Sequence, residues 1–321
     1  MKREIKKIIL VMLLISCNRN VQETTYNNAK AIFSPDGSKV VAVYYSGKII
    51  VWDTITYNII SVYTGENDFF SLDFSPDGRY IVYGARYEDT TIFDIDNNCI
   101  VKTFPAKAGS VLSVAYSHNG RYIASGFAAS KIFIWDIETG ENIYQFNAHK
   151  GNVTAIEFSP DDKYLVSAGT DYIINIWNLE NGYCERQLTG KFSYDKYLGF
   201  TYSVKFDKSG NRIISGSTMN KRIAIWNTIN GKIIKNLSGH KYNVMSLCFS
   251  RDGKILASGS INEIKLWDIY NEKLLLTIFE KIGRVGSLSF HPNGNVLLSA
   301  GSNEGLIRLW DLSSGKKIKE F

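Results

Sequence analysis

The chain has 321 residues, of which 45% are hydrophobic, 13% aromatic and 21% charged, and its formal net charge is +6. Short β-branched apolar runs, such as KVVAVYY at residues 39–45, favour an all-β fold over a helical one. Without the basic N-terminal segment, 33 positive and 30 negative side chains remain, which gives a net charge of +3. This even balance argues against a nucleic-acid-binding protein, in which Lys and Arg gather into one stripe.

Residues 1–16 have the layout of a secretory signal peptide. A basic start, MKREIKK, is followed by an apolar run over Ile8–Ile15 and by the small residue Ser16. The apolar run is much shorter than the roughly 20 residues that a transmembrane helix needs. We therefore expect a cleaved segment and no permanent membrane span.

The residues Leu-Ile-Ser-Cys at positions 14–17 resemble the bacterial lipobox, in which the cysteine is acylated and the chain is cut just before it. The resemblance implies a lipid on Cys17, a short polar tether over residues 17–28, and a place at the cell envelope, facing the periplasm or the cell surface. The alternative is an ordinary secretory signal with an incidental cysteine. Three cysteines follow, Cys99, Cys184 and Cys248, and their spacing suggests neither a metal site nor a disulfide, so we expect mostly buried free thiols.

Two markers recur in phase over residues 29–321 and divide this region into seven units. The first is an aromatic residue followed by Asp or Asn, at intervals of 41, 42, 42, 49, 41 and 43 residues: Trp52-Asp53, Phe93-Asp94, Trp135-Asp136, Trp177-Asn178, Trp226-Asn227, Trp267-Asp268 and Trp310-Asp311. The second is a turn of the Phe-Ser-Pro-Asp-Gly type, which begins at Phe33, Phe74, Tyr116, Phe158, Phe206, Phe249 and Phe290. Two markers that stay in step indicate one repeat architecture and leave no residues for a second domain.

The fourth unit illustrates the strand content of a repeat, with four short β-rich runs at residues 152–158, 164–168, 173–177 and 183–188. The pattern resembles the WD-repeat family, whose unit is one four-stranded propeller blade. The resemblance implies a seven-bladed β-propeller with four antiparallel strands per blade over residues 29–321. Because residues 317–321 can form the last strand of the seventh blade, and residues 18–28 are short and polar, we expect closure by side-chain packing without an N-terminal strand clasp.

The resemblance also implies a buried hydrogen-bond network within a blade, which runs from Trp to Ser, His and Asp. In the fourth unit the matching residues are His149, Ser167, Asp171 and Trp177. In the sixth unit the corresponding frame is His240, Ser258, Asn262 and Trp267, with Asn in place of the acid, so only the fourth unit has the complete set. A His–Asp pair is also part of a catalytic triad, but a set repeated in degraded form indicates a structural role.

Loops that lead into the first strand of each blade surround one mouth of the central channel and form the expected contact surface for partners. Six residues occupy equivalent positions in these loops: Asp68, Ser110, Asn152, Phe200, Asn243 and Arg284. The long interval of 49 residues places an insertion at 190–201, which adds Phe192, Tyr194 and Tyr197 beside Phe200. Exposed aromatic residues are favoured anchors at protein interfaces, although these four could equally fold back onto the propeller.

These features predict a non-catalytic scaffold for protein–protein interactions, attached to the membrane through its N-terminal lipid, monomeric, and without cofactor, metal or nucleic-acid partner. A client among outer-membrane assembly proteins would be one version of this role. The alternative is a propeller hydrolase in which Asp68, Asn152 and Asn243 hold a metal at the channel mouth. Hard cations prefer several carboxylates and this ring offers one. The sequence contains no Gly-rich phosphate loop, no His-Glu-x-x-His and no Gly-x-Ser-x-Gly motif.

Overall fold

A computed structural model of the chain describes residues 28–189, 200–217, 221–301 and 305–321. The described residues contain antiparallel strands and turns, and no helix occurs among them. The expectation of an all-β fold built from four-stranded antiparallel units is confirmed. The predicted signal peptide over residues 1–16, Cys17 and the tether over 17–28 lie outside the described residues, apart from Asn28.

Five sheets have four strands each, and in every one the strands are hydrogen-bonded in chain order. The first sheet contains β1 (Ala29–Phe33), β2 (Lys39–Tyr44), β3 (Lys48–Asp53) and β4 (Ile59–Thr64). The second contains β5 (Phe69–Phe74), β6 (Tyr80–Ala85), β7 (Thr90–Asp94) and β8 (Cys99–Phe104). The third contains β9 (Val111–Tyr116), β10 (Tyr122–Phe127), β11 (Lys131–Asp136) and β12 (Asn142–Asn147).

The fourth sheet contains β13 (Val153–Phe158), β14 (Tyr164–Gly169), β15 (Ile174–Asn178) and β16 (Tyr183–Leu188), and the fifth contains β17 (Thr201–Phe206), β18 (Arg212–Ser217), β19 (Arg222–Asn227) and β20 (Ile233–Ser238). The sixth sheet has seven strands: β21 (Ser246–Phe249), β22 (Ile255–Gly259), β23 (Ile261–Asp268), β24 (Lys273–Phe290), β25 (Val296–Gly301), β26 (Ile307–Asp311) and β27 (Lys317–Glu320).

The long strand β24 joins the last two repeat units, which the sequence predicts as separate sheets. Its first part pairs with β23, as in Lys265↔Thr277, and its last part pairs with β25, as in Leu288↔Ser299. The connecting residues belong to the same strand, although Gly283 has a φ of 72°, and Arg284 pairs with Ile261. The sixth and seventh units therefore share one continuous strand where the other units are linked by loops.

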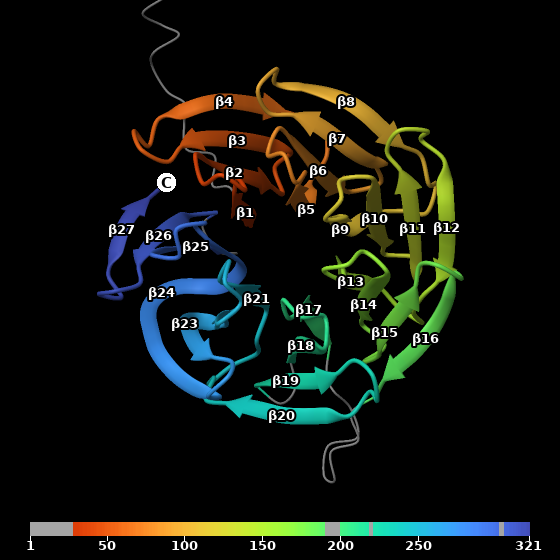
Figure 1. Cartoon of the computed structure of the whole chain (residues 1–321). Coiled ribbons are helices and arrows are strands. Elements are labelled where there is room, and N and C mark those ends of the chain that lie inside the picture. The colour runs from red at the N-terminus through yellow and green to blue at the C-terminus, as the bar shows by residue number, and fades with distance from the viewer. Residues whose placement is uncertain (1–27, 190–199, 218–220, 302–304) are drawn as a thin grey trace, which may run out of the picture.

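The six sheets surround a central channel, with the first strand of each sheet innermost and the fourth strand of the four-stranded sheets at the perimeter (Figure 1). A cavity of about 160 Å³ inside the channel is lined by residues of β1, β5, β9, β13, β17, β21 and β24. Apolar clusters fill the seams between neighbouring sheets, and one further cluster lies within the seven-stranded sheet, between its two halves. The second and third strands are apolar along nearly their whole length because both of their faces are buried against neighbours.

The first and last repeat units meet through side chains. Ser287 Oγ in β24 accepts a hydrogen bond from Ala31 N–H at 2.9 Å, and Ser289 Oγ accepts one from Phe33 N–H at 3.1 Å. An apolar cluster between them combines residues of β1–β3 with Leu298, Ala300, Ile307 and Leu309. The predicted lack of a clasp concerns residues near Thr24, which lie outside the described part of the chain, and stays a prediction.

Candidate functional site

The structure brings the four network residues of the fourth unit together. His149 Nδ1 lies 2.9 Å from Asp171 Oδ1, and His149 Nε2 lies 2.8 Å from Ser167 Oγ. Trp177 Nε1 donates a hydrogen bond to the same Ser167 oxygen at 2.9 Å. Asp171 also accepts the Lys150 backbone N–H at 2.9 Å, so the network ties the loop that enters β13 to the turn between β14 and β15. Each buried polar group thereby finds a partner in the next.

The sixth unit also has a complete network, and the prediction that Asn262 replaces its acid is wrong. His240 Nδ1 lies 2.7 Å from Glu263 Oε1, His240 Nε2 lies 2.7 Å from Ser258 Oγ, and Trp267 Nε1 donates to Ser258 at 2.8 Å. Asn262 is exposed at a φ of 59°, and its side chain accepts the Gly283 N–H. The acid is Glu263, on β23, whose longer side chain reaches inward.

The spacing of the motif did not point to Glu263. Counting four positions forward from Ser258, the offset from Ser167 to Asp171, gives Asn262, and counting six positions back from Trp267 gives Ile261. Both counts miss the acid because it lies on β23 in the sixth unit, whereas Asp171 lies in the turn before β15 in the fourth.

Neither histidine is accessible to a substrate. The side chains of His149 and His240 are both 0% exposed, while those of Asp171 and Glu263 are 8% and 2% exposed. A general base must reach the proton that it abstracts directly or through one water molecule. The geometry of both networks therefore favours a structural role over half of a catalytic triad.

Acidification should destabilise the folded chain through the network of the sixth unit. Burial alone would raise the pKa of Glu263, but hydrogen bonds from Lys241 N–H and His240, together with the Lys265 charge, hold this pKa below its usual value. Burial also lowers the pKa of His240. Both groups bind fewer protons in the folded chain than in the unfolded chain, so the unfolding free energy should fall as the pH drops below the ordinary histidine pKa of about 6.5 and further near that of Glu, about 4.3.

Urea unfolding at a series of pH values between 7 and 4 would measure this dependence. The variant Glu263→Gln cannot ionise at this position, so its unfolding free energy should fall less steeply below about pH 5 than that of the unchanged chain. Parallel curves for the two proteins would show that Glu263 does not contribute to the acid sensitivity.

Five of the six predicted rim residues lie just before an inner strand, and Arg284 lies within β24. Most of the six already have partners within the chain. Asp68 forms an ion pair with Arg86 at 2.7 Å, and Ser110 Oγ accepts the Tyr87 N–H at 3.2 Å. The Asn243 carbonyl accepts a hydrogen bond from Ser260 Oγ at 2.8 Å. These contacts hold the rim loops against the adjacent turns.

Asn152 and Arg284, both exposed, line a cavity of about 350 Å³ at the mouth of the channel. We call it the channel-mouth cavity; its walls also include Lys30, Phe70 and Tyr202. Desolvation in the channel lowers the pKa of Lys30 to about 8. The structure thus brings rim residues from sheets far apart in the sequence to one opening that combines aromatic walls with positive charge.

The aromatic insertion is described in part. Phe192, Tyr194 and Tyr197 lie outside the described residues. Phe200 is 37% exposed and its ring stacks on that of Tyr172, with centroids 5.2 Å apart and an interplanar angle of 7°. Thr201, the last residue assigned to the insertion by sequence, is a buried residue of β17. One aromatic of the insertion therefore packs on the fourth sheet and still presents an edge to solvent.

Charged side chains in the channel connect the inner strands of neighbouring sheets. The sequence analysis did not predict these contacts. Asp73 Oδ2 accepts the Tyr116 N–H at 2.9 Å, and Glu157 Oε2 accepts the Phe206 N–H at 2.5 Å. Glu157 Oε1 also lies 2.7 Å from Lys205 Nζ. Burial raises the pKa of Asp73. These side chains bond backbone N–H groups of the inner strands, which have no neighbouring strand on the channel side. The sequence did not predict these pairs because their members lie more than 40 positions apart.

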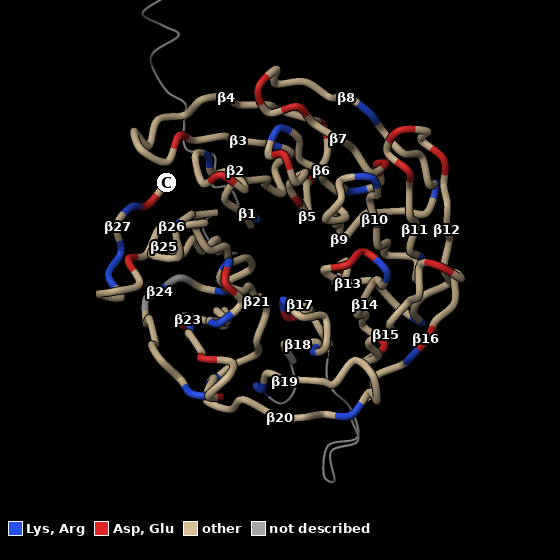
Figure 2. Tube along the Cα trace, viewed as in Figure 1, with Lys and Arg blue, Asp and Glu red and all other residues tan. Residues whose placement is uncertain are grey.

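Other candidate chemistry is sparse in the part of the chain that the structure describes. No group of three or more His, Cys, Asp or Glu side chains that could hold a metal ion occurs among these residues, and no helix there is long and apolar enough to cross a membrane. Cys248 is buried, but Cys99 and Cys184 are exposed, so the expectation of mostly buried thiols is wrong for two of them. Positive and negative residues alternate around the ring in Figure 2, without one basic stripe in this view.

Antiparallel four-stranded units around a channel, two of which contain a buried Trp–Ser–His–acid network, define an all-β repeat protein. The family described as "WD domain, G-beta repeat" matches residues 98–136, 140–178, 184–227, 231–268 and 273–311, more than half of the chain. The chain therefore belongs to the WD-repeat family. The matched segments begin at residue 98, at the last strand of the second unit. In the unmatched part, Ala42 and Tyr83 stand where later units have Ser, and Phe93 stands in place of Trp.

Three relatives are similar over short segments. A bromodomain and WD repeat-containing protein of Dictyostelium discoideum is 34% identical over 64 residues, 20% of this chain and 3% of its own length. The guanine nucleotide-binding protein subunit beta of Schizosaccharomyces pombe is 38% identical over 61 residues, 19% of each chain. The COMPASS component SWD3 of Saccharomyces cerevisiae is 37% identical over 68 residues, 20% of this chain and 21% of its own. The chain thus matches about a fifth or less of the length of these relatives.

Proposed function

We propose that this protein is a non-catalytic scaffold for protein–protein interactions, built as a seven-bladed propeller and held at the bacterial cell envelope by a lipid on Cys17. The observation that carries the proposal is the channel-mouth cavity, where exposed Asn152 and Arg284 from separate sheets meet aromatic walls. Aromatic residues and Arg are enriched at protein interfaces. Two of the three relatives are named as a subunit or a component of a larger assembly, which fits the same role.

The arrangement of strands around β24 supports a count of seven blades, if the seven-stranded sheet is divided there. Each half has four strands when β24 is counted in both, and the apolar cluster between the halves has the composition of the clusters between separate sheets. The number of blades then equals the number of repeat units in the sequence. In this arrangement the His149 and His240 networks are structural parts of the fourth and sixth blades.

The hydrolase alternative has less support from the rim. Asp68 would supply its one carboxylate, but this group is ion-paired with Arg86 at 2.7 Å, so its charge is already neutralised. Asn152 and Asn243 would contribute neutral oxygens, which bind hard cations weakly on their own. Metal analysis of the purified protein would test this alternative, since about one equivalent of retained divalent cation would favour it over a scaffold.

The scaffold proposal is tested by chemical crosslinking in intact cells, followed by purification and identification of the captured proteins. Three versions of the full chain are compared: unchanged, with residues 190–199 deleted, and with Arg284→Glu. The deletion stops short of Thr201 because that residue belongs to β17. We expect the same partner to be lost from one or both variants while their melting temperatures remain those of the unchanged chain. Capture of the same proteins at the same yield by all three would contradict a binding surface at the rim.

A further inference from the structure

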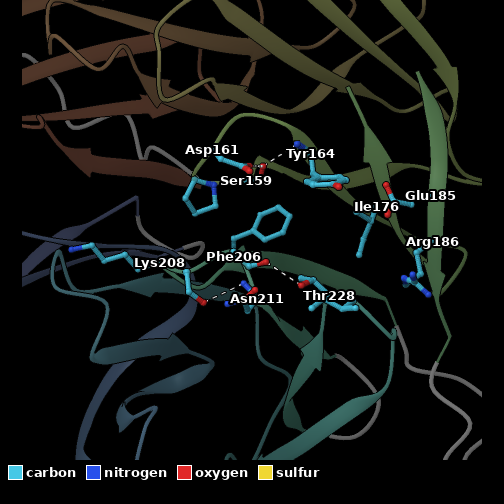
Figure 3. Close-up of a pocket in the computed structure, with 14 residues that line it drawn as sticks. Ser159, Asp161, Tyr164, Ile176, Glu185, Arg186, Phe206, Lys208, Asn211 and Thr228 are labelled. Carbon is cyan, nitrogen blue, oxygen red and sulfur yellow. Dashed lines mark hydrogen bonds between the residues drawn. The ribbon is translucent and has the colours of Figure 1, made fainter. Parts of the chain in front are cut away.

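A second opening lies between the fourth and fifth sheets, away from the rim. Its cavity has a volume of about 610 Å³, and its lining combines the apolar side chains of Tyr164, Ile176, Phe206 and Ile229 with charged ones (Figure 3). We call it the side groove. Because the turns that line it follow the inner strands whereas rim residues precede them, it opens at the opposite end of these strands. A volume of this size is within the range of roughly 300–1,000 Å³ that ligand pockets occupy.

The side groove is open because one repeated apolar residue is missing from it. In five units the residue after the Trp-Asp-type dipeptide is Ile or Leu, and it packs on the preceding sheet: Ile95, Ile137, Leu179, Ile269 and Leu312. Its backbone N–H makes the same bond each time, as from Leu179 to Lys163 O at 2.9 Å. In the fifth unit Thr228 makes the equivalent bond to Asn211 O at 3.0 Å.

Thr228 leaves the groove unfilled because its side chain turns toward its own sheet. Its hydroxyl donates a hydrogen bond to Gly210 O at 3.1 Å, within the turn before β18. The first unit also has a threonine here, Thr54, but Tyr57 and Phe321 pack into that seam. At the seam between the third and fourth sheets, where Leu179 is in place, the corresponding cavity measures about 440 Å³. The seam between the fourth and fifth sheets thus has space for one aliphatic side chain. In five other units an Ile or Leu of the chain occupies the equivalent position.

A cationic group at the same groove also lacks its usual partner. Arg186 on β16 pairs with Ile176 on β15. Tyr144 and Lys102 occupy the equivalent position on the outer strands of the two preceding sheets. Tyr144 Oη donates to Leu179 O at 2.9 Å, and Lys102 Nζ donates to Ile137 O at 2.5 Å. The Arg186 guanidinium, in contrast, makes no hydrogen bond or ion pair with any residue that the structure describes, and its stem lies beside Gly231.

The acidic residues of the groove are already engaged. Asp161 Oδ1 accepts Ser159 Oγ at 2.6 Å and Lys163 N–H at 3.2 Å, and Glu185 Oε2 accepts Asn178 Nδ2 at 3.0 Å. Figure 3 places Arg186 at one end of the groove and Lys208 at the other, with Phe206 and Ile176 between them. Among the charged side chains of the groove, those of Arg186 and Lys208 are therefore the ones that have no hydrogen bond or ion pair with a described residue.

We propose that the side groove binds a peptide segment of a partner protein in which a Leu or Ile side chain is followed by Asp or Glu. The aliphatic side chain fills the space that Thr228 leaves, as Leu179 does one seam earlier. The carboxylate pairs with Arg186, whose planar guanidinium suits a bidentate contact. This site is separate from the rim and does not depend on the scaffold role proposed for the rim.

The test uses the full chain with labelled isoleucine methyl groups and the capped peptide Ac-Gly-Leu-Asp-Gly-NH2. We expect saturable NMR shifts at Ile176 and Ile229, and an affinity about fivefold lower when the peptide carries Ala for Leu or Asn for Asp. Thr228→Leu should weaken binding by about tenfold while the melting temperature stays the same or rises, because the new side chain fills the groove. Arg186→Gln should remove the preference for Asp over Asn.

The rim variant Asn152→Ala is the matched control and should bind the peptide with unchanged affinity. The proposal fails if the peptide produces no saturable shifts, if Thr228→Leu binds it as well as the unchanged chain, or if Arg186→Gln still discriminates Asp from Asn. Arg186 is partly exposed and Arg186→Gln breaks no hydrogen bond or ion pair with a described residue, so this second variant remains informative even if Thr228→Leu does not fold. None of these outcomes bears on partner capture at the rim.

Discussion

Replacing Glu263 with Ala should lower the free energy of unfolding by about 3–5 kcal/mol, the range expected when one partner of a buried ion pair is removed. Glu263 stands between His240 at 2.7 Å and Lys265 at 3.6 Å, and the side chains of all three are at most 6% exposed. Without the carboxylate, the Lys265 charge stays buried, and among the described residues it keeps the Thr277 hydroxyl as a hydrogen-bond partner. Urea unfolding at pH 7 measures the change.

The neighbouring residue provides the matched control for this variant. Asn262→Gly should change the unfolding free energy by less than about 1 kcal/mol, because Asn262 is exposed and glycine tolerates its φ of 59°. The sequence-based assignment of Asn262 to the network would have predicted the opposite order. A larger loss from Asn262→Gly than from Glu263→Ala would therefore contradict the network described for the sixth unit.

Cys17→Ser should move the protein from the membrane fraction to the soluble fraction of fractionated cells. The lipid anchor proposed for Cys17 is the expected source of membrane affinity, since each buried CH₂ of an acyl chain contributes about 0.8 kcal/mol. The control is Cys99→Ser, which changes an exposed cysteine of β8 and should leave the protein in the membrane fraction.

Two other outcomes of this fractionation would contradict a lipid anchor at Cys17. If the unchanged protein is already exported and soluble, the N-terminal segment is an ordinary secretory signal. If Cys17→Ser stays with the membrane, another part of the chain carries the attachment. Either result would refute lipid anchoring at Cys17.

The sequence predicted those features of the fold that repeat, and it failed where one repeat departs locally from the others. The phase of the Trp-Asp and Ser-Pro-Asp-Gly markers located the four-stranded units and the network around His149, because each marker has the same structural role in every unit. The assignment of Asn262 failed because the acid of the sixth unit, Glu263, lies on β23 itself and not in the turn before the third strand, where Asp171 lies in the fourth unit. The continuity of β24 was missed because its connecting residues, EKIGRVG at 280–286, include two glycines and three charged residues, which is the composition of a loop.

The candidate sites depend on contacts between distant units, which a single sequence does not show. Glu157 and Lys205 meet in the channel from adjacent sheets, and Arg284 reaches the same cavity as Asn152 from more than 130 positions away. The alignment of units did predict that the rim residues share one end of the inner strands. It could not predict that Asp68 is neutralised by Arg86, nor that Thr228 turns away from the fourth sheet.

The central claim, that partners bind at the rim, is tested most directly by photo-crosslinking in living cells with a benzophenone amino acid at single positions. Rim positions 110, 152 and 284 are compared with the perimeter positions 62, 101 and 318, which are exposed apolar residues of β4, β8 and β27. We predict one discrete partner adduct from the rim positions and none from the perimeter positions. Equal adducts from both sets, or adducts from the perimeter alone, would contradict the account.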